Sequence, residues 1–248
     1  MPSSPPSTAP LRAGRPRRGA LALAGAAVLV PLLGACSGGG GGAAEEGQTP
    51  EDVLTAAKTN LDETPGLNLT LSTGELPEGV QGVTGAQGVA TRQPAFDGDI
   101  GVVVSGFDAE VPVIAVDDVV YAQLPLTSGW QEIEPEDFGA PDPATLLDTE
   151  TGFSSILPLT EDVEEGESVR GGEDNSEVLT EYTGTVPGEA VTFLIPSTEG
   201  DVDAVYTVDD EQRLRRAELT GVFYPDTEAI TYVVTFDDYG LETEVTAP

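Results

Sequence analysis

The residues of this chain that could do chemistry are mainly carboxylates, because its 248 residues include no histidine. The commonest general base, the commonest metal ligand and every Ser-His-Asp arrangement are therefore missing. Among the 44 acidic residues, the pairs Asp201/Asp203 and Asp237/Asp238 could form a dyad or bind calcium. Neither pair lies in a calcium-loop pattern, and both lie at ends of expected strands, where acidic residues are usually exposed. With no phosphate loop or dinucleotide motif either, we expect no catalytic residue, no metal site and no cofactor, and not an enzyme.

The single cysteine, Cys36, lies at the position that an acylated cysteine has in an export signal. Four arginines between positions 12 and 18 precede an apolar run at 20–30, which is shorter than the roughly 20 residues that cross a hydrocarbon core. This order is typical of a secretory signal peptide, and Leu33-Gly34-Ala35-Cys36 resembles the lipobox of bacterial lipoproteins. We expect residues 1–35 to be a lipoprotein signal peptide and Cys36 to be lipidated. The alternative is an ordinary secreted protein with a free thiol after the cleavage site.

Composition divides the remaining chain into a tether and a domain. Glycine and serine dominate the stretch after Cys36, and such a composition gives a flexible coil. We therefore expect residues 36–48 to be the acylated cysteine with a flexible Gly-rich tether, and residues 49–248 to be one domain. Such a protein would be exported and anchored by lipid to the outer face of the cell membrane, in the cell envelope.

The charge of the mature chain excludes some partners. The signal peptide carries four of the ten basic residues and none of the 44 acidic ones, which leaves six against 44 and a net charge of −38. Nucleic acid and anionic lipid head groups attract clusters of Lys and Arg, so neither is an expected partner. Arg213, Arg215 and Arg216 are the exception, and we favour pairing with carboxylates such as Asp210 and Glu218 over a cationic site for a head group.

The periodicity of apolar residues predicts one helix followed by many strands. Residues 49–64 have the cap, the proline and the apolar face of an amphipathic helix. The period then changes to two, and short helices bounded by Pro and Gly are expected near 144–147, 153–157 and 188–194. Strands are expected at 67–71, 100–104, 111–115, 119–124, 130–133, 161–169, 178–186, 202–208, 214–219 and 230–236. Because few helices connect the strands, the sheet should be largely antiparallel, in an α+β fold.

A series of segments along the chain forms a recognisable pattern. The segments are Val120-Tyr-Ala-Gln-Leu-Pro-Leu-Thr-Ser-Gly-Trp130, Phe138-Gly-Ala-Pro-Asp-Pro143, Leu146-Leu-Asp148, Tyr182-Thr-Gly-Thr-Val-Pro187, Tyr206-Thr-Val-Asp-Asp210 with Arg213-Leu214, and Val234-Thr-Phe-Asp-Asp-Tyr-Gly240. No single segment is decisive, but their order behind a lipobox is specific. From about Thr49 onward the chain resembles the LppX/LprG lipoproteins of actinobacterial envelopes, a family that comprises LppX, LprA, LprF and LprG.

The resemblance implies a fold and a function. It implies an antiparallel β half-barrel with short helices on its concave side, which together enclose a hydrophobic cavity. It also implies binding of complex envelope lipids or glycolipids with two or three acyl chains, and their transport between envelope layers. An efflux transporter of the major facilitator class is the protein partner that the resemblance implies.

Candidate cavity residues follow from the strand periodicity and from the expected short helices. Alternation does not separate a cavity lining from a packed core, so each candidate could equally be a core residue. The candidates are Ile100, Val102, Val104, Val113, Tyr121, Phe153, Ile156, Leu157, Val191 and Leu194. Two other functions stay open: a scaffold or surface lipoprotein with a closed core, and a lipid hydrolase that uses Ser or Asp.

Overall fold

The computed structural model describes residues 47–171 and 175–248, so Cys36 and the predicted signal peptide lie outside the described residues. The described chain forms one antiparallel sheet with a few short helices, none of which is long and apolar enough to span a membrane. The helices are α1 (Pro50–Glu63), α2 (Gly188–Val191) and the 3-10 helices η1 (Pro135–Phe138), η2 (Pro143–Thr145) and η3 (Phe153–Leu159). The strands are β1 (Gly66–Thr73), β2 (Gly82–Thr91), β3 (Ala95–Val104), β4 (Phe107–Val116), β5 (Val119–Ala122), β6 (Gln131–Ile133), β7 (Glu161–Gly171), β8 (Glu177–Val186), β9 (Glu199–Asp209), β10 (Leu214–Val222) and β11 (Ile230–Asp237).

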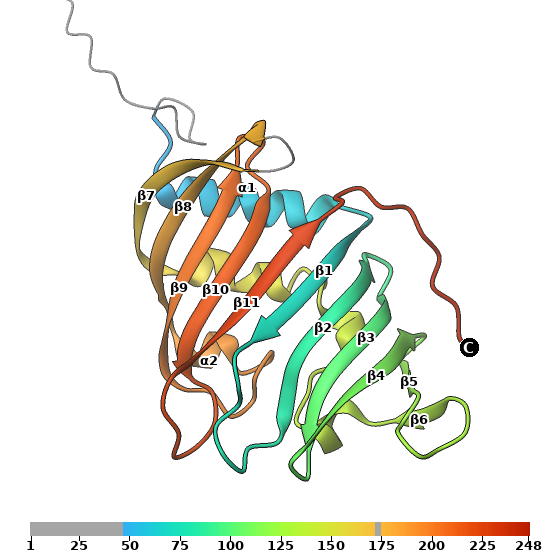
Figure 1. Cartoon of the computed structure of the whole chain (residues 1–248). Helices are drawn as coiled ribbons and strands as arrows, with labels where there is room; N and C mark the ends of the chain where they lie inside the picture. The colour runs from blue at the N-terminus through green and yellow to red at the C-terminus, as the bar shows by residue number, and fades with distance from the viewer. Residues whose placement is uncertain (1–46, 172–174) are drawn as a thin grey trace, which may run out of the picture. The chain divides into compact units, whose positions relative to one another are not determined.

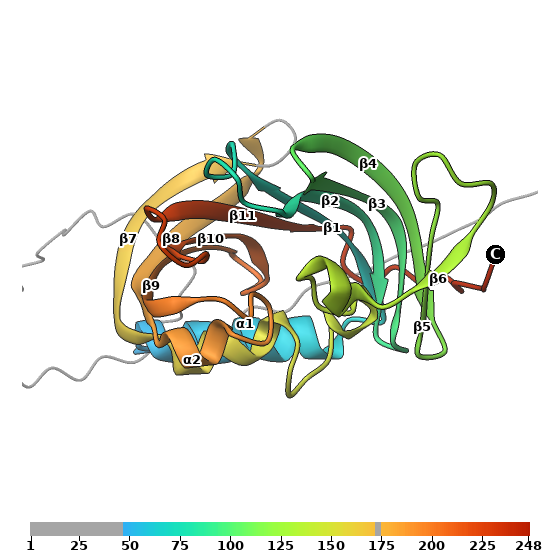
Figure 2. The same ribbon diagram turned by 90° about the horizontal axis from the view of Figure 1, so that it is seen from below.

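The eleven strands follow a simple path through the sheet. Strands β1 to β6 run in order from the middle to one edge, and β7 to β11 run in order from the opposite edge back to the middle. Their order is β6-β5-β4-β3-β2-β1-β11-β10-β9-β8-β7, so the first and last strands are neighbours. They pair from Asn68 opposite Asp237 to Thr73 opposite Tyr232. The sheet stays open, with β6 and β7 at its edges, and it curves so that one face is concave (Figure 1, Figure 2).

Helix α1 begins and ends almost where the sequence predicts. Thr49 accepts a hydrogen bond from the Asp52 amide at 3.3 Å, and Asp52 accepts one from the Thr49 amide at 3.0 Å, which is a capping box. Pro50 fits the first turn because its missing N–H would have no partner there. The buried side chains Val53, Leu54, Ala57 and Leu61 form the predicted apolar face, which packs against η3 and against β7 and β10.

Strand β2 was not among the strands predicted from the sequence. It is rich in glycine and has no run of β-branched residues, so its period of two is weak. The glycines have a structural reason, because Gly88 lies opposite Gly98 of β3 and a Cβ at either position would meet backbone of the other strand. The side chain of Phe96 also lies against Gly88, so a small residue there makes room for a large one.

The short helices lie on the concave face, as predicted, but they are tighter or shorter than expected. Residues near 144 and 153–157 form the 3-10 helices η2 and η3, and Pro158 inside η3 removes one backbone donor. Helix α2 contacts β9 while η2 contacts β2, β3 and β4, so α1, η3 and α2 cover mainly the β7–β11 half (Figure 2). The predicted antiparallel half-barrel with short helices on its concave side is confirmed, and the two halves of its concave face are covered differently.

Candidate functional site

Two adjoining apolar pockets lie on the concave face. The larger has a volume of about 540 Å³, within the roughly 300–1,000 Å³ typical of small-molecule sites, and the smaller has about 120 Å³. Five residues line both pockets, so the two spaces share a wall: Val83, Ile100, Ala140, Pro141 and Pro143. The larger pocket is also lined by Val102, Val104, Phe107, Asp108, Ala109, Val111, Val113, Val120, Ala122, Leu124, Pro125, Leu126, Ile133, Pro135 and Phe138.

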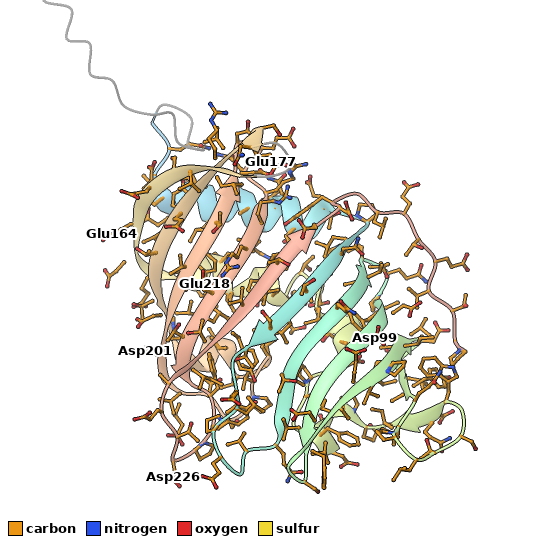
Figure 3. The ribbon with its side chains drawn as sticks, in the orientation of Figure 1. Asp99, Glu164, Glu177, Asp201, Glu218 and Asp226 are labelled. Carbon is orange, nitrogen blue, oxygen red and sulfur yellow. The ribbon has the colours of Figure 1, made fainter. Side chains whose placement is uncertain are left out.

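The strand register explains why the wall of the larger pocket is apolar. Val102 lies opposite Ala109 and Ile100 opposite Val111, and farther along β4, Val113 lies opposite Ala122. Because side chains alternate between the two faces, these positions point to the same side of the sheet. The residues between them point the other way and include Asp97, Asp99 and Glu110, which gives the outer face its acidic character (Asp99 in Figure 3).

Three of the five shared residues come from a proline-rich segment, residues 139–143. Gly139 follows the end of helix η1, and its positive φ of 67° reverses the chain without strain. The carboxylate of Asp142 then accepts a hydrogen bond from the Ala144 amide at 2.9 Å and so caps η2. Prolines at 141 and 143 restrict the backbone further, so a short loop of fixed path divides the cavity.

The smaller pocket has aromatic walls whose polar atoms are already hydrogen-bonded. Its aromatic lining residues are Phe96, Phe153, Tyr224 and Tyr232, and Phe153 packs against the core residue Phe236 with 5.1 Å between ring centroids. Burial raises the pKa of Tyr232 above its ordinary value, so the hydroxyl stays neutral. This pocket therefore presents an uncharged surface.

The structure brings seven of the ten predicted cavity residues to the pockets. Ile100 lines both; Val102, Val104 and Val113 line the larger; Phe153, Val191 and Leu194 line the smaller. Tyr121 lines neither, because its neighbours Val120 and Ala122 point into the larger pocket and Tyr121 points to the other face. Ile156 and Leu157 are fully buried in the core and also line neither pocket.

The loops contribute lining residues that the sequence analysis did not select. Leu124, Pro125 and Leu126 come from the β5–β6 connection, and Phe138 ends η1. No periodicity marks an apolar residue in a loop. The only sequence signal for these residues was that apolar side chains occur among polar neighbours in segments expected to be exposed. Phe107 begins β4 beside a two-residue turn and could have been found in the same way.

The described side chains of the pockets offer little chemistry. Asp108 is the only charged residue in either lining. In residues 47–171 and 175–248, no three side chains of His, Cys, Asp or Glu are placed to hold a metal ion. Asp201 and Asp203 are exposed, and Asp237 and Asp238 accept hydrogen bonds from Arg215 and Asn68.

One serine lies beside a lysine, and its surroundings are those of a structural contact. Ser154 donates to the Asp62 carboxylate at 2.5 Å, and Lys58 donates to Ser154 at 3.3 Å and to Asp62 at 2.7 Å. Lys58 also donates to the Thr149 carbonyl at 2.8 Å, so the cluster ties α1 to the segment around η3. Ser154 is buried and lines neither pocket, which gives it no access to a substrate held there.

The three clustered arginines are paired with carboxylates. Arg213 pairs with Asp209 at 2.8 Å, and Arg216 with Glu218 at 2.9 Å. Arg215 lies 3.0 Å from Asp237. The sequence-based expectation of pairing is confirmed with Glu218, while the described ion pairs use Asp209 where Asp210 was expected.

Comparisons with known proteins agree with this geometry. The family model described as LppX_LprAFG lipoprotein matches residues 49–247. The crystal structure of LprF from Mycobacterium bovis is similar with a TM-score of 0.64 and 12% identity, covering 80% of this chain and 96% of that one. That of the lipoprotein LppX from Mycobacterium tuberculosis has a TM-score of 0.58 and 14% identity, covering 79% and 98%. No curated protein sequence matches the chain.

Proposed function

Because this chain belongs to the LppX_LprAFG lipoprotein family, we propose that it is an exported carrier that holds acyl chains of envelope lipids in the two pockets of its concave face. The observation that carries this proposal is the larger pocket, which has about 540 Å³ of space and one charged residue in its lining. Transfer of an acyl chain of about sixteen carbons into water costs roughly 12 kcal/mol of free energy, at about 0.8 kcal/mol per methylene. A carrier must therefore offer an apolar enclosure of this kind.

The cargo in this proposal is a complex lipid or glycolipid with two or three acyl chains. The two adjoining pockets support more than one chain, because a branched lipid could place different chains on the two sides of residues 139–143. The mainly apolar walls support contacts to the acyl chains, with the head group left toward solvent. The carrier would move such lipids between envelope layers, with a major facilitator transporter as its expected protein partner.

The remaining parts of the chain have roles in the same proposal. Residues 1–35 are the signal peptide, Cys36 carries the acyl anchor, residues 36–48 are the tether, and residues 49–248 are the lipid-binding domain. Anchored to the outer face of the cell membrane, the domain would reach lipids in that leaflet without leaving the envelope. Two acyl chains on Cys36 suffice for stable anchoring.

The open volume supports a carrier over the alternative of a scaffold lipoprotein with a closed core. A closed core would have interdigitated side chains and few voids larger than a water molecule. The core around Tyr182, Tyr206 and Leu214 matches that description because these side chains are fully buried, but the concave face of β2–β5 borders open space. The hydrolase alternative receives no support from Ser154, for the reasons given above.

The proposal can be tested by native mass spectrometry of the mature protein, followed by solvent extraction of its lipids. We expect a noncovalent di- or triacyl lipid at near-stoichiometric amount, which is released on denaturation while the lipid on Cys36 stays bound. In the variant Val113→Trp, an indole would fill the larger pocket, and the amount of released lipid should fall severalfold.

The matched control is Ile114→Trp, the next residue of β4, which points to the outer face. It adds the same bulk to the same strand and should leave the lipid load unchanged. A protein free of noncovalent lipid that also takes up none from envelope extract would refute the carrier function. An equal loss of lipid in both variants would show that the larger pocket is not the binding site.

A further inference from the structure

Large exposed apolar side chains gather at the mouth of the larger pocket. Of the six such side chains in the described part of the chain, four line that pocket, while Leu159 and Val169 lie elsewhere. We call the four the apolar rim: Val104, Phe107, Leu126 and Phe138. A group of exposed apolar residues beside a pocket marks a surface that contacts something outside the chain.

The rim is built from three separate segments, and one of them is a rigid hairpin. Val104 and Phe107 face each other at the end of the β3–β4 ladder. Ser105 and Gly106 between them both have positive φ, of 53° and 78°, as in the two-residue turns that match strand twist. The Phe107 side chain is 76% exposed. Because the turn before it has a defined conformation, Phe107 is held at a fixed position at the end of the hairpin.

Leu126 supports an external contact independently, because the backbone conformation of its turn disfavours leucine at this position. The Thr127 amide donates to the Leu124 carbonyl at 3.2 Å, which closes a turn with Pro125 at the second position and Leu126 at the third. Leu126 has a φ of 68°, and such turns prefer glycine there because a Cβ is strained at positive φ. The side chain is also fully exposed. A leucine that is both strained and exposed gains no burial from the described chain, which favours a contact outside it.

The charges around the apolar rim limit which kind of surface it can contact. Neither the rim nor the lining of either pocket contains Lys or Arg, and Asp108 lies next to Phe107. The full chain has a net charge of −34, and acidic residues such as Asp99, Glu164 and Glu218 lie on the outer face (Figure 3). An anionic lipid surface would repel the protein, whereas a zwitterionic or uncharged one allows apolar side chains to enter the boundary between head groups and acyl chains.

We propose that the apolar rim is a membrane-contact edge that inserts into the surface of a zwitterionic or uncharged lipid bilayer. This inference rests on the proposed function, since the edge places the pocket mouth against the bilayer. An acyl chain can then pass from the bilayer to the pocket without exposure to water. The outer face, with its carboxylates, stays in solvent.

The edge can be tested with single fluorescent labels on the mature lipoprotein in phosphatidylcholine vesicles whose acyl chains carry a nitroxide quencher. Phe107→Cys and Leu126→Cys place an environment-sensitive label on the rim, and Glu164→Cys on β7 is the control at the far edge of the sheet (Figure 3). We expect the two rim labels to be quenched and shifted to the blue, and the control label to be unaffected. Equal quenching at all three positions, or none at the rim, would overturn the proposal. Protein-concentration-dependent shielding of the rim labels without vesicles would also overturn it, in favour of a second copy.

A transfer measurement separates this inference from the proposed function. The double variant Phe107→Ser/Leu126→Gly removes the two most exposed rim side chains and places glycine where the turn prefers it. Its rate of lipid uptake from vesicles should fall about tenfold or more, and its rate of uptake from detergent micelles, which requires no bilayer contact, should fall much less, although both residues also line the larger pocket. An equal fall from both sources would show that the two side chains act within the pocket, and would overturn the membrane-contact edge. Uptake from vesicles at the normal rate would overturn the membrane-contact edge alone. A normal chain that binds no lipid from either source would instead refute the carrier function, whatever the labels report.

Discussion

The hydroxyl groups of Tyr224 and Tyr232 are 2.9 Å apart, and Tyr232 donates its own proton to the Val83 carbonyl at 2.8 Å. Tyr224 must therefore be the donor to Tyr232. Tyr224 lies in the β10–β11 connection, Tyr232 in β11 and Val83 in β2. Strands β2 and β11 flank β1, so the hydrogen bonds cross the place where the first and last strands pair. This small chain of hydrogen bonds ties the two halves of the sheet together in the wall of the smaller pocket.

The variant Tyr232→Phe should therefore lower the stability of the fold without changing the character of the pocket. It leaves the Val83 carbonyl and the Tyr224 hydroxyl without their partner, which costs about 1–3 kcal/mol when such groups are buried. Chemical denaturation should show this loss in the free energy of unfolding, and the lipid load should remain normal because the ring is kept. An unchanged free energy of unfolding would mean that water replaces the lost partner.

Tyr182 and Tyr206 should respond differently to the same substitution, although they are neighbours in the register of β8 and β9. The Tyr206 hydroxyl donates to Thr160 at 3.0 Å, since Thr160 itself donates to the Ile156 carbonyl. The buried Tyr182 hydroxyl has no hydrogen-bond partner among the described residues. We expect Tyr206→Phe to cost about 1 kcal/mol and Tyr182→Phe to be neutral or slightly stabilising. Thermal unfolding of the two variants compares them directly, and a larger loss in Tyr182→Phe would contradict the prediction.

The buried tyrosines also predict how stability depends on alkaline pH. Burial raises the pKa of Tyr182 from 10.0 to about 12, with the charge of Glu165 adding to the effect, and burial also raises the pKa of Tyr206 and Tyr239. Because the folded state keeps these protons when the unfolded state loses them, this contribution to stability is complete below pH 10.0 and declines from there upward. Denaturation at a series of pH values should show the decline, and tyrosine absorbance should show that the buried groups titrate above pH 10.0. Stability that stays flat up to pH 12 would contradict this.

Much of this fold could be predicted because its signals are local. The capping box around Thr49 and the alternation at 202–208 each settle an element without knowledge of its neighbours. Strand β2 could not be found in this way, since its glycines are explained by a cross-strand contact between Gly88 and Gly98 that only the assembled sheet reveals.

The candidate site was predictable where alternation was unambiguous. Asp97, Asp99 and Gly101 alternate with the positions of Ile100 and Val102 in β3, so these residues fix which face is apolar, although Val103 is apolar as well. In β5, Val119, Val120 and Tyr121 are consecutive and apolar, so the sequence does not say which of the two phases faces inward, and a shift of one residue reverses every side chain. Ile156 and Leu157 show a second limit, because a short helix on the concave face can fill the core or border a pocket with the same residues.

The Asp209 carboxylate should be the costliest single charge to remove from the β9–β10 turn. It is fully buried and accepts hydrogen bonds from the Glu211 and Arg213 amides at 3.0 and 2.9 Å and from the Arg213 side chain at 2.8 Å. Asp209→Ala leaves these donors unpaired, and we expect a loss of about 3 kcal/mol in the free energy of unfolding. Glu218→Ala is the matched control, because its pair with Arg216 is partly exposed and should cost less than about 1 kcal/mol. Equal losses in the two variants would show that the turn does not depend on the buried carboxylate.

The scarcity of charge in the pockets predicts selectivity for the head group of the cargo. With no Lys or Arg in the lining of either pocket, the normal chain should load phosphatidylcholine in preference to phosphatidylglycerol. Val104 is 38% exposed at the pocket mouth, so Val104→Lys would place an ammonium group there while its charge stays hydrated. We expect that variant to shift the preference toward phosphatidylglycerol by about fivefold at low salt and less at high salt, as a solvent-exposed ion pair requires.

Mass spectrometry of lipid bound from an equimolar mixture measures the shift. Val103→Lys is the control, because it adds the same charge one residue earlier on β3, where the side chain points to the other face. An equal shift in both variants would show that net charge alone governs selectivity. A shift only in Val104→Lys would place the head group at the pocket mouth, because an exposed charge acts only within about 10 Å at ordinary salt.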